Sequence, residues 1–270
     1  MQLVGLDVGF SAKRETTGVA TLVNSTLEVG RAKSTIAGRR ELFEHISTAD
    51  VVAIDGPLLP VLDARIRPCE RLFARGQFQR RCKPGFSHVK GTGLQLRNAA
   101  YECALQLRGI ASCEPLPTPA PLILSPSNIV EAFPNAFLGV CVSAEQYLAM
   151  PTLRRGEKFK SLYGEWSRVG TFRRLLEELA QVLPGGFPRV CEFNRDHEEQ
   201  AAIICLATAA AVAKGRYTAV GDPLGGYFYL PPWPLWANWA RTELDAQRKR
   251  DVSVSVWIDG LAFSAEQALP

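Results

Sequence analysis

Three acidic side chains follow short apolar segments that have the composition of strands. Asp7 comes after Leu-Val-Gly-Leu, Asp55 after Val-Val-Ala-Ile, and Glu131 after Ile-Val. A carboxylate among apolar side chains is costly to bury without a partner. Because neighbouring strands of a sheet lie about 5 Å apart, three such groups can converge on one or two divalent cations. The pattern therefore predicts a Mg²⁺ or Mn²⁺ site, in which paired ions activate water and stabilise the leaving oxygen of a phosphodiester.

Each of these acids also has a structural explanation when it is taken alone. Asp7 can cap a turn before Gly9, and Asp55 can cap a turn at the Gly-Pro that follows it. Glu131 can form an ion pair with an arginine. The metal interpretation therefore depends on the three acids occurring together at the ends of predicted strands.

A fourth acidic group opens an alanine-rich segment of the chain. Asp196 and Glu199 are three residues apart, so on a helix they share a face. This is also the spacing of an N-cap residue and its capping-box partner, and acids in a first turn interact favourably with the helix dipole. We expect an acid of this group to complete the site, with Asp196 as the fourth metal ligand and Glu199 as a further catalytic candidate.

The segment 65–83 carries seven cations against one acid, Glu70. The cations are Arg65, Arg67, Arg71, Arg75, Arg80, Arg81 and Lys83. Phe73 and Phe78 are interleaved with them. Because basic side chains neutralise phosphates and aromatic faces stack on unpaired bases, the segment is predicted to bind DNA or RNA. The alternative is a solvated helix face with Phe73 in the core, and Arg67 belonging to a separate site.

One histidine is a further candidate for contact with the substrate. His88 lies in a glycine-rich loop with Lys90 and could act as a general base or bind phosphate. The alternative is a solvated loop histidine. Its spacing from the nearest cysteines, Cys69 and Cys82, is too irregular to indicate a zinc site.

The predicted metal site requires that the strands carrying these carboxylates lie next to each other in the sheet. Apolar runs predict strands at 3–8, 18–23, 27–33, 51–55 and 129–133, a strand or turn at 225–230, and a strand at 252–258. Helical spacing predicts helices at 39–47, 94–107, 172–183, 196–214 and 239–249, with a partial helix at 65–82. Four prolines make 115–121 an extended loop. Hairpins followed by strands that alternate with helices predict an α/β fold, a mixed sheet with helices on both faces.

Composition excludes several classes of protein. The 270 residues are 47% hydrophobic and 21% charged, which is typical of a globular chain rather than a disordered or fibrous one. The apolar run 201–213 is too short to span a bilayer, and the N-terminus lacks the features of a signal peptide. Seven cysteines without a CxxC pair favour reduced thiols. We therefore expect a cytoplasmic protein with no membrane partner.

Six short motifs occur in the same order as in the DUF429 family, which the chain resembles over about residues 3 to 232. They are Leu3-Val4-Gly5-Leu6-Asp7, Ala53-Ile54-Asp55-Gly56-Pro57, Arg67-Pro68-Cys69-Glu70, Val130-Glu131-Ala132-Phe133-Pro134, Asp196-His197-Glu198-Glu199 and Gly225-Gly226-Tyr227-Phe228. The family is described as predicted nucleases of the RNase H-like fold. The resemblance implies an RNase H-like domain at 1–232. The tryptophans of the extension at 233–270 are expected to pack it onto this domain.

The resemblance also implies which acids bind metal. The carboxylates of the family would fall on Asp7, Asp55 and Glu131, plus an acid from the helix that begins near Asp196. The family pattern often has an Asp-Ala pair early in that helix, where this chain has Gln200-Ala201. Asp196 or Glu199 would then supply the ligand, or the site is incomplete.

These observations predict a nuclease that hydrolyses phosphodiester bonds of nucleic acid through carboxylate-held Mg²⁺ or Mn²⁺. One alternative is a non-catalytic RNase H-like scaffold that binds nucleic acid or protein, which Gln200 favours. Another is an actin-like, ATP-dependent phosphotransferase, whose Asp-x-Gly signature resembles Asp7 to Ser11. That class needs a second Asp-Gly loop, and residues 222–226 match it poorly.

Overall fold

The structure, a computed structural model, describes most of the chain. The described residues are 1–11, 13–24, 26–46, 49–59, 66–82, 85–87, 91–108, 128–150, 157–168, 175 and 196–263. Several sequence predictions fall outside these ranges and stay predictions. They concern Arg65, Lys83, His88, the loop at 115–121 and nearly all of the helix at 172–183.

Strands of the described ranges form one nine-stranded sheet, in the order β3-β2-β1-β4-β5-β7-β6-β8-β9. The strands are β1 (Gln2–Asp7), β2 (Thr17–Val23), β3 (Thr26–Ala32), β4 (Val51–Asp55), β5 (Ile129–Ala132), β6 (Thr218–Asp222), β7 (Gly226–Leu230), β8 (Ser255–Ile258) and β9 (Leu261–Ala262). The first three pair antiparallel, whereas β4 is parallel to β1, and β5 is parallel to both β4 and β7. The mixed α/β sheet predicted from the sequence is confirmed.

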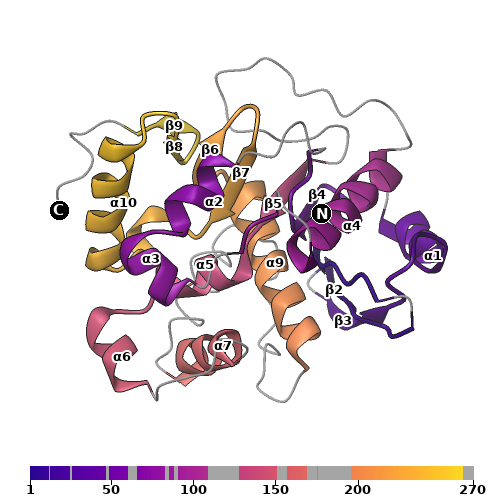
Figure 1. Ribbon diagram of the computed structural model, residues 1–270. Coiled ribbons are helices and arrows are strands. Elements are labelled where there is room, and N and C mark those ends of the chain that lie inside the picture. The colour runs from indigo at the N-terminus through magenta and orange to yellow at the C-terminus, as the bar shows by residue number, and fades with distance from the viewer. Residues whose placement is uncertain are drawn as a thin grey trace.

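Helices cover both faces of this sheet. They are α1 (Ile36–Ile46), α2 (Pro68–Phe73), α3 (Gly76–Arg81), α4 (Thr92–Arg108), α5 (Pro134–Gly139), α6 (Ala144–Ala149), α7 (Lys158–Arg168), α9 (His197–Ala213), α10 (Asn238–Arg250) and the 3-10 turn η1 (Trp233–Leu235). Helix α9 crosses β1, β2 and β4 on one face, and α1 and α4 pack together on the other (Figure 1). Within the described ranges, none of the helices combines the length and apolar composition needed to cross a bilayer.

Alternation along the central strands divides the core in two. Leu3 and Ala53 belong to the core that contains α9, whereas Val4 and Ile54 belong to the core under α1 and α4. Because successive strand side chains point to opposite faces, residues with the parity of Leu3 face α9. This rule fixes where each acid at the strand ends is directed.

Two glycines bring α9 unusually close to the sheet. A β-carbon on Gly5 would overlap backbone atoms of Ala202 and Leu206, and one on Gly18 would overlap the backbone carbonyl of Glu198. A larger residue at either position would push the helix away. The first turn of α9 therefore lies directly over the ends of β1 and β2.

The structure differs from the sequence predictions in several elements. Strand β5 ends one residue earlier than predicted, and helix α5, which was not predicted, begins at Pro134, because proline fits the first position of a helix. Strand β6 was not predicted, and neither were α6 and α7. The predicted capping box of α9 is absent: Asp196 occupies the N-cap position but makes no side-chain cap hydrogen bond.

The C-terminal residues continue the same sheet. Strand β8 pairs with β6, and Trp236 and Trp239 are buried. Both indole rings contact Phe78 of α3, with centroids 6.5 and 5.7 Å from its ring. Tryptophans of the extension thus pack it against the rest of the chain.

The close approach of α9 gives a stability prediction. We expect Gly5→Ala to lower the free energy of unfolding by about 1–3 kcal/mol or more, because the added methyl group would displace the helix backbone. Gly30→Ala, on edge strand β3, is the matched control, since a β-carbon there meets no atom within 4 Å. Urea denaturation measures both. Equal stability of the two variants would contradict the proposed contact.

Candidate functional site

Asp7 and Asp55 form a pair of neighbouring carboxyl groups. They end the parallel strands β1 and β4 and are aligned in register. Asp7 has the parity of Gly5, so both acids face α9. Their side chains are hydrogen-bonded to each other, which requires a proton on one of the two carboxyl groups.

The surroundings of this pair favour its protonated form. Burial raises the pKa of Asp55 to about 7, and the charge of Glu131 adds to the rise. Burial also raises the pKa of Asp7 well above its ordinary value, with further contributions from the charges of Asp55 and Glu198. Two crowded carboxylates that are partly withdrawn from water need either a proton or a cation between them.

Glu198 is the third acid near this pair. It lies in the first turn of α9, where its backbone carbonyl packs against Gly18, the in-register neighbour of Asp7. Its charge raises the pKa of Asp7. The sequence predictions named Asp196 and Glu199 but not Glu198. Residues 200–211 of α9 are all buried, so their apolar pattern does not indicate which face of the helix meets the sheet. The structure shows that face through Ala202, which lies one helical turn beyond Glu198 and contacts the sheet at Gly5.

The other acids at the start of α9 are placed differently. The Asp196 carboxylate accepts a hydrogen bond from Nη2 of Arg31 on β3, which takes the place of the predicted capping bond. Glu199 is partly buried. Gln200 lies about half a turn around the helix from Glu198, so it is directed away from the acid pair. Its side chain is buried and its Oε1 has no hydrogen-bond partner among the described residues.

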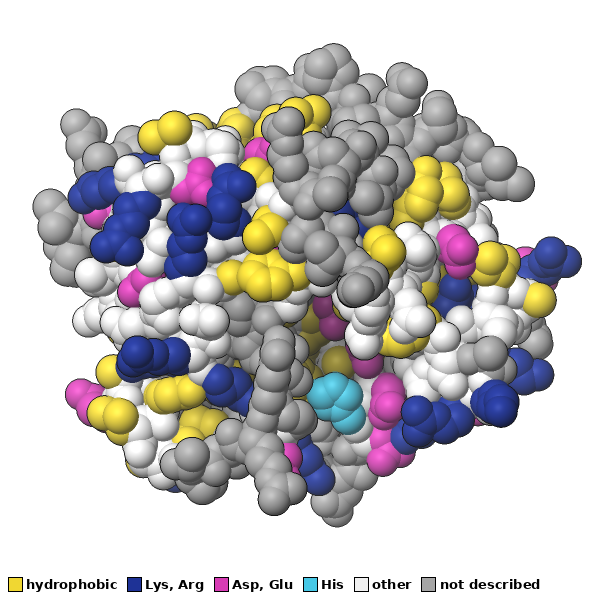
Figure 2. Space-filling model, in the orientation of Figure 1, with side chains coloured by type: hydrophobic (Ala, Val, Ile, Leu, Met, Phe, Trp, Pro, Cys, Tyr) yellow, Lys and Arg dark blue, Asp and Glu magenta, His cyan; other side chains and the backbone are white. Residues whose placement is uncertain are grey.

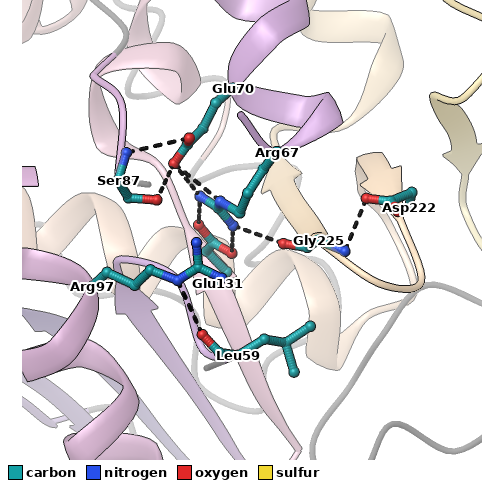
Figure 3. A network of polar contacts seen from close by, with 8 residues as sticks. All are labelled: Leu59, Arg67, Glu70, Ser87, Arg97, Glu131, Asp222 and Gly225. Atoms are coloured by element: carbon teal, nitrogen blue, oxygen red, sulfur yellow. Dashed lines mark hydrogen bonds and ion pairs between the residues drawn. The ribbon is translucent and has the colours of Figure 1, made fainter. Parts of the chain in front are cut away.

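Glu131 belongs to a separate buried network. It pairs in register with Ile54 rather than Asp55, so it is directed to the face that α4 covers. There its two oxygens accept hydrogen bonds from Nη1 and Nη2 of Arg67, both at 2.8 Å (Figure 3). Burial raises the pKa of Glu131, and the charge of Arg67 opposes the rise.

Arg67 has all five N–H donors occupied. Besides the two bonds to Glu131, Nε and Nη2 donate to Glu70 at 3.0 and 2.9 Å, and Nη1 donates to the Gly225 carbonyl at 3.0 Å. The backbone N–H and hydroxyl of Ser87 both donate to Glu70. This arginine therefore joins α2, β5 and the β6–β7 turn, as Figure 3 shows.

A small cavity lies where Asp55 meets the network of Arg67, Glu70 and Glu131. It has a volume of about 80 Å³ and is lined by Asp55, Arg67, Glu70 and Glu131 together with apolar side chains. Those apolar residues include Phe86, Leu96, Phe133 and Phe228. Asp55 therefore adjoins both Asp7, its partner in the acid pair, and the cavity of the arginine network.

Most described cations of the basic segment already have protein partners. Arg71 donates to the Asp251 carboxylate from Nε at 2.6 Å and from Nη2 at 3.1 Å. The guanidinium of Arg81 lies over the rings of Tyr147 and Trp239. Among the described cations of the basic segment, only Arg75 and Arg80 are exposed to solvent.

The aromatic residues of this segment lie in the core. Phe73 and Phe78 are fully buried, and their ring centroids are 4.6 Å apart. They cannot stack on bases without unfolding of the surrounding core. The structure therefore agrees with the alternative that placed Phe73 in the core, and it leaves the nucleic-acid role of the segment as a prediction.

The acid pair is the part of the predicted carboxylate set that the structure brings together. Glu131 and Asp196 are each held by an arginine instead. In the view of Figure 2, acidic side chains border a hollow beside a histidine. The described residues contain no group of three or more His, Cys, Asp or Glu side chains already arranged to hold a metal ion.

No known family model, curated protein or solved structure matches this chain.

The arginine network predicts that substitutions at two neighbouring arginines lower the free energy of unfolding by very different amounts. We expect Arg67→Gln to lower the free energy of unfolding by about 3–5 kcal/mol, because it leaves two buried carboxylates without their cation. Arg71→Gln, in the helix α2 that Arg67 precedes as N-cap, is the matched control. Its ion pair with Asp251 is partly exposed, so a loss of about 1 kcal/mol or less is expected. Urea denaturation at neutral pH measures the free energy of unfolding of both variants. Equal losses would contradict the role assigned to the Arg67 network.

The acid pair predicts that stability falls as pH rises. The native state keeps a proton on Asp55 up to about pH 7, whereas the unfolded chain loses it near 3.8. The free energy of unfolding should therefore decrease between these values, by up to about 1.4 kcal/mol per pH unit for one proton. The experiment is urea denaturation at several pH values in a buffer with a metal chelator.

Two variants separate this effect from other titrations. Asp55→Asn should flatten the slope and stabilise the protein above about pH 7. Asp251→Asn should leave the slope between about pH 5 and 7 unchanged, because the Arg71 hydrogen bonds lower the pKa of Asp251 to about 2. A wild-type slope that survives Asp55→Asn would show that other groups cause it.

Proposed function

We propose that this protein is a metal-dependent hydrolase that cleaves phosphodiester bonds of nucleic acid. The observation that carries the proposal is the hydrogen-bonded pair of Asp7 and Asp55 at the ends of adjacent parallel strands. Each of two carboxyl groups held this close disfavours the ionised form of the other, so the pair is stabilised by a proton or a cation. A divalent cation can replace the shared proton.

The strand order supports an RNase H-like assignment for the fold. The antiparallel strands β3, β2 and β1 are followed in the sheet by the parallel strands β4 and β5. This agrees with the arrangement that the DUF429 resemblance implies. Helix α9, which brings Glu198 to the sheet, packs on the face to which Asp7 and Asp55 point.

The chemical type of the donors suits Mg²⁺ or Mn²⁺, although the three acids would have to move closer together to bind one ion. Both ions prefer oxygen ligands, and Asp7, Asp55 and Glu198 offer carboxylate oxygens from two strands and a helix. When bound, such an ion supplies an activated water and charge stabilisation for the leaving oxygen. Glu131, engaged by Arg67, acts on this site through its charge on Asp55 rather than as a ligand.

Asp7 and Asp55 must release their shared proton before they can act as ligands. Their affinity for a cation should therefore rise with pH through the range in which Asp55 titrates. The two acids are held at fixed spacing by the strand register, which limits the reorganisation needed on binding.

A second candidate is a scaffold of the same fold that binds without cutting. The absence of a three-ligand arrangement in the described residues favours it. We do not propose a phosphotransferase, because the Asp-Gly turn at 222–226 closes a hairpin. The Asp222 carboxylate there accepts the backbone N–H groups of Leu224 and Gly225.

The proposal predicts distinct effects at the two neighbouring glutamates of α9. We expect Glu198→Gln and Asp7→Asn to reduce Mn²⁺-dependent cleavage at least about a hundredfold, since each removes a ligand charge worth several kcal/mol. Glu199→Gln is the matched control and should retain cleavage. The assay uses mixed DNA and RNA substrates, with the melting temperature measured with and without Mn²⁺.

Asp7→Asn should also raise the melting temperature of the metal-free protein, because it relieves repulsion with Asp55. It should abolish stabilisation by Mn²⁺. A wild-type protein that shows neither cleavage nor stabilisation by Mn²⁺ would contradict the hydrolase proposal and leave the scaffold.

A further inference from the structure

Four residues form a straight row across the sheet. Arg31 of β3 pairs in register with Gly18 of β2, Gly18 with Asp7 of β1, and Asp7 with Asp55 of β4. In-register partners point to the same face, so Arg31 and the two acids all face α9. Adjacent strands are about 5 Å apart, which places Arg31 two strands from Asp7, within reach of its long side chain.

Arg31 borders the acid site without being enclosed by it. Its Nη2 donates to Asp196 and lies 3.9 Å from a carboxylate oxygen of Glu198, which is longer than a hydrogen bond. Both contacts use the same nitrogen. The Arg31 side chain keeps 33% of its exposure, so the rest of the guanidinium can reach a ligand in solvent.

The acidic side chains around the site would repel an anionic substrate, and a cation such as Arg31 would offset this repulsion. Asp55 and Glu198 act on Asp7 through their charges, and Asp196 lies at the same end of the sheet through its contact with Arg31. Even with one divalent cation, these acids repel an anionic substrate. A fixed arginine at the rim offsets the repulsion, and its planar fork matches the oxygens of a phosphate.

We propose that Arg31 binds a backbone phosphate of the nucleic-acid substrate beside the acid pair. This inference rests on the proposed hydrolase function, since it names the group that holds its substrate. When a cation takes the charge of Glu198, Arg31 loses one of its two acidic neighbours. Nη1 and Nε, which take no part in the contacts with Asp196 and Glu198, are then available to the phosphate.

The competing role for Arg31 is that of an anchor for the first turn of α9. The two roles differ in what they require of Asp196. An anchor fails when either partner is removed, so Arg31→Ala and Asp196→Asn would have the same effect. A phosphate contact depends on Arg31 alone, and loss of the Asp196 charge would leave or improve binding of an anion.

The test measures binding of a fluorescein-labelled single-stranded DNA 12-mer as a function of salt. Ca²⁺ replaces Mn²⁺ to slow cleavage. Arg31→Ala should weaken binding about tenfold. It should also reduce the slope of log affinity against log salt by about 0.7, the value for one phosphate contact on a single strand. Arg31→Lys should restore the slope but not the full affinity, because it keeps the charge and loses the fork.

Asp196→Asn is the matched control and should bind at least as tightly as wild type. The proposal is overturned if Arg31→Ala leaves the salt slope unchanged, if both variants weaken binding and lower the melting temperature alike, or if wild type does not bind the 12-mer. The hydrolase function is tested separately by Mn²⁺ stabilisation and cleavage in the wild type. If these fail while binding still depends on Arg31, the hydrolase is excluded and the phosphate contact stands.

Discussion

Helix α9 lies so close to β1 and β2 that only glycine fits at positions 5 and 18. At these two positions no side chain separates the helix from the sheet. The consequence of this contact is electrostatic, because the first turn of the helix brings Glu198 beside Asp7. A sheet end that would otherwise carry two acids becomes a concentrated negative site. The proposed cation and the proposed phosphate contact of Arg31 would both offset that concentration of negative charge.

The hydrogen-bond network of Arg67 explains how Glu131, an acid on the opposite face of the sheet from α9, can be buried. Glu131 is neutralised by Arg67, whose five donors are all used within the protein. A buried ion pair of this kind contributes little net stability compared with apolar packing, yet removing one partner is costly. Its effect is to fix α2 and the β6–β7 turn to the sheet. The acid pair and the Arg67 network meet at Asp55, whose pKa is raised by burial and by the charge of Glu131.

Sequence reasoning predicted the sheet better than it predicted the site. The apolar segments before Asp7 and Asp55 identified their strands and the parallel pairing of β4. The face that each acid occupies depends on register, which apolar composition does not specify for strands buried on both faces. This is why Glu131 was expected beside Asp55 but is directed to Arg67. Similarly, the partner of an arginine cannot be read from local charge, so the basic segment resembled an exposed surface.

The arginine network also affects how the chain reaches its native state. Arg67 bonds to Gly225 across 158 residues, and β5 lies in the sheet beside β7 rather than beside β6. These contacts cannot form on a ribosome until most of the chain has emerged. Closing such long loops has an entropic cost that is repaid only after docking, which slows folding. Until β7 has been synthesised, the edge of β5 that pairs with it is unpaired, and an edge of this kind is a surface on which chaperones can act.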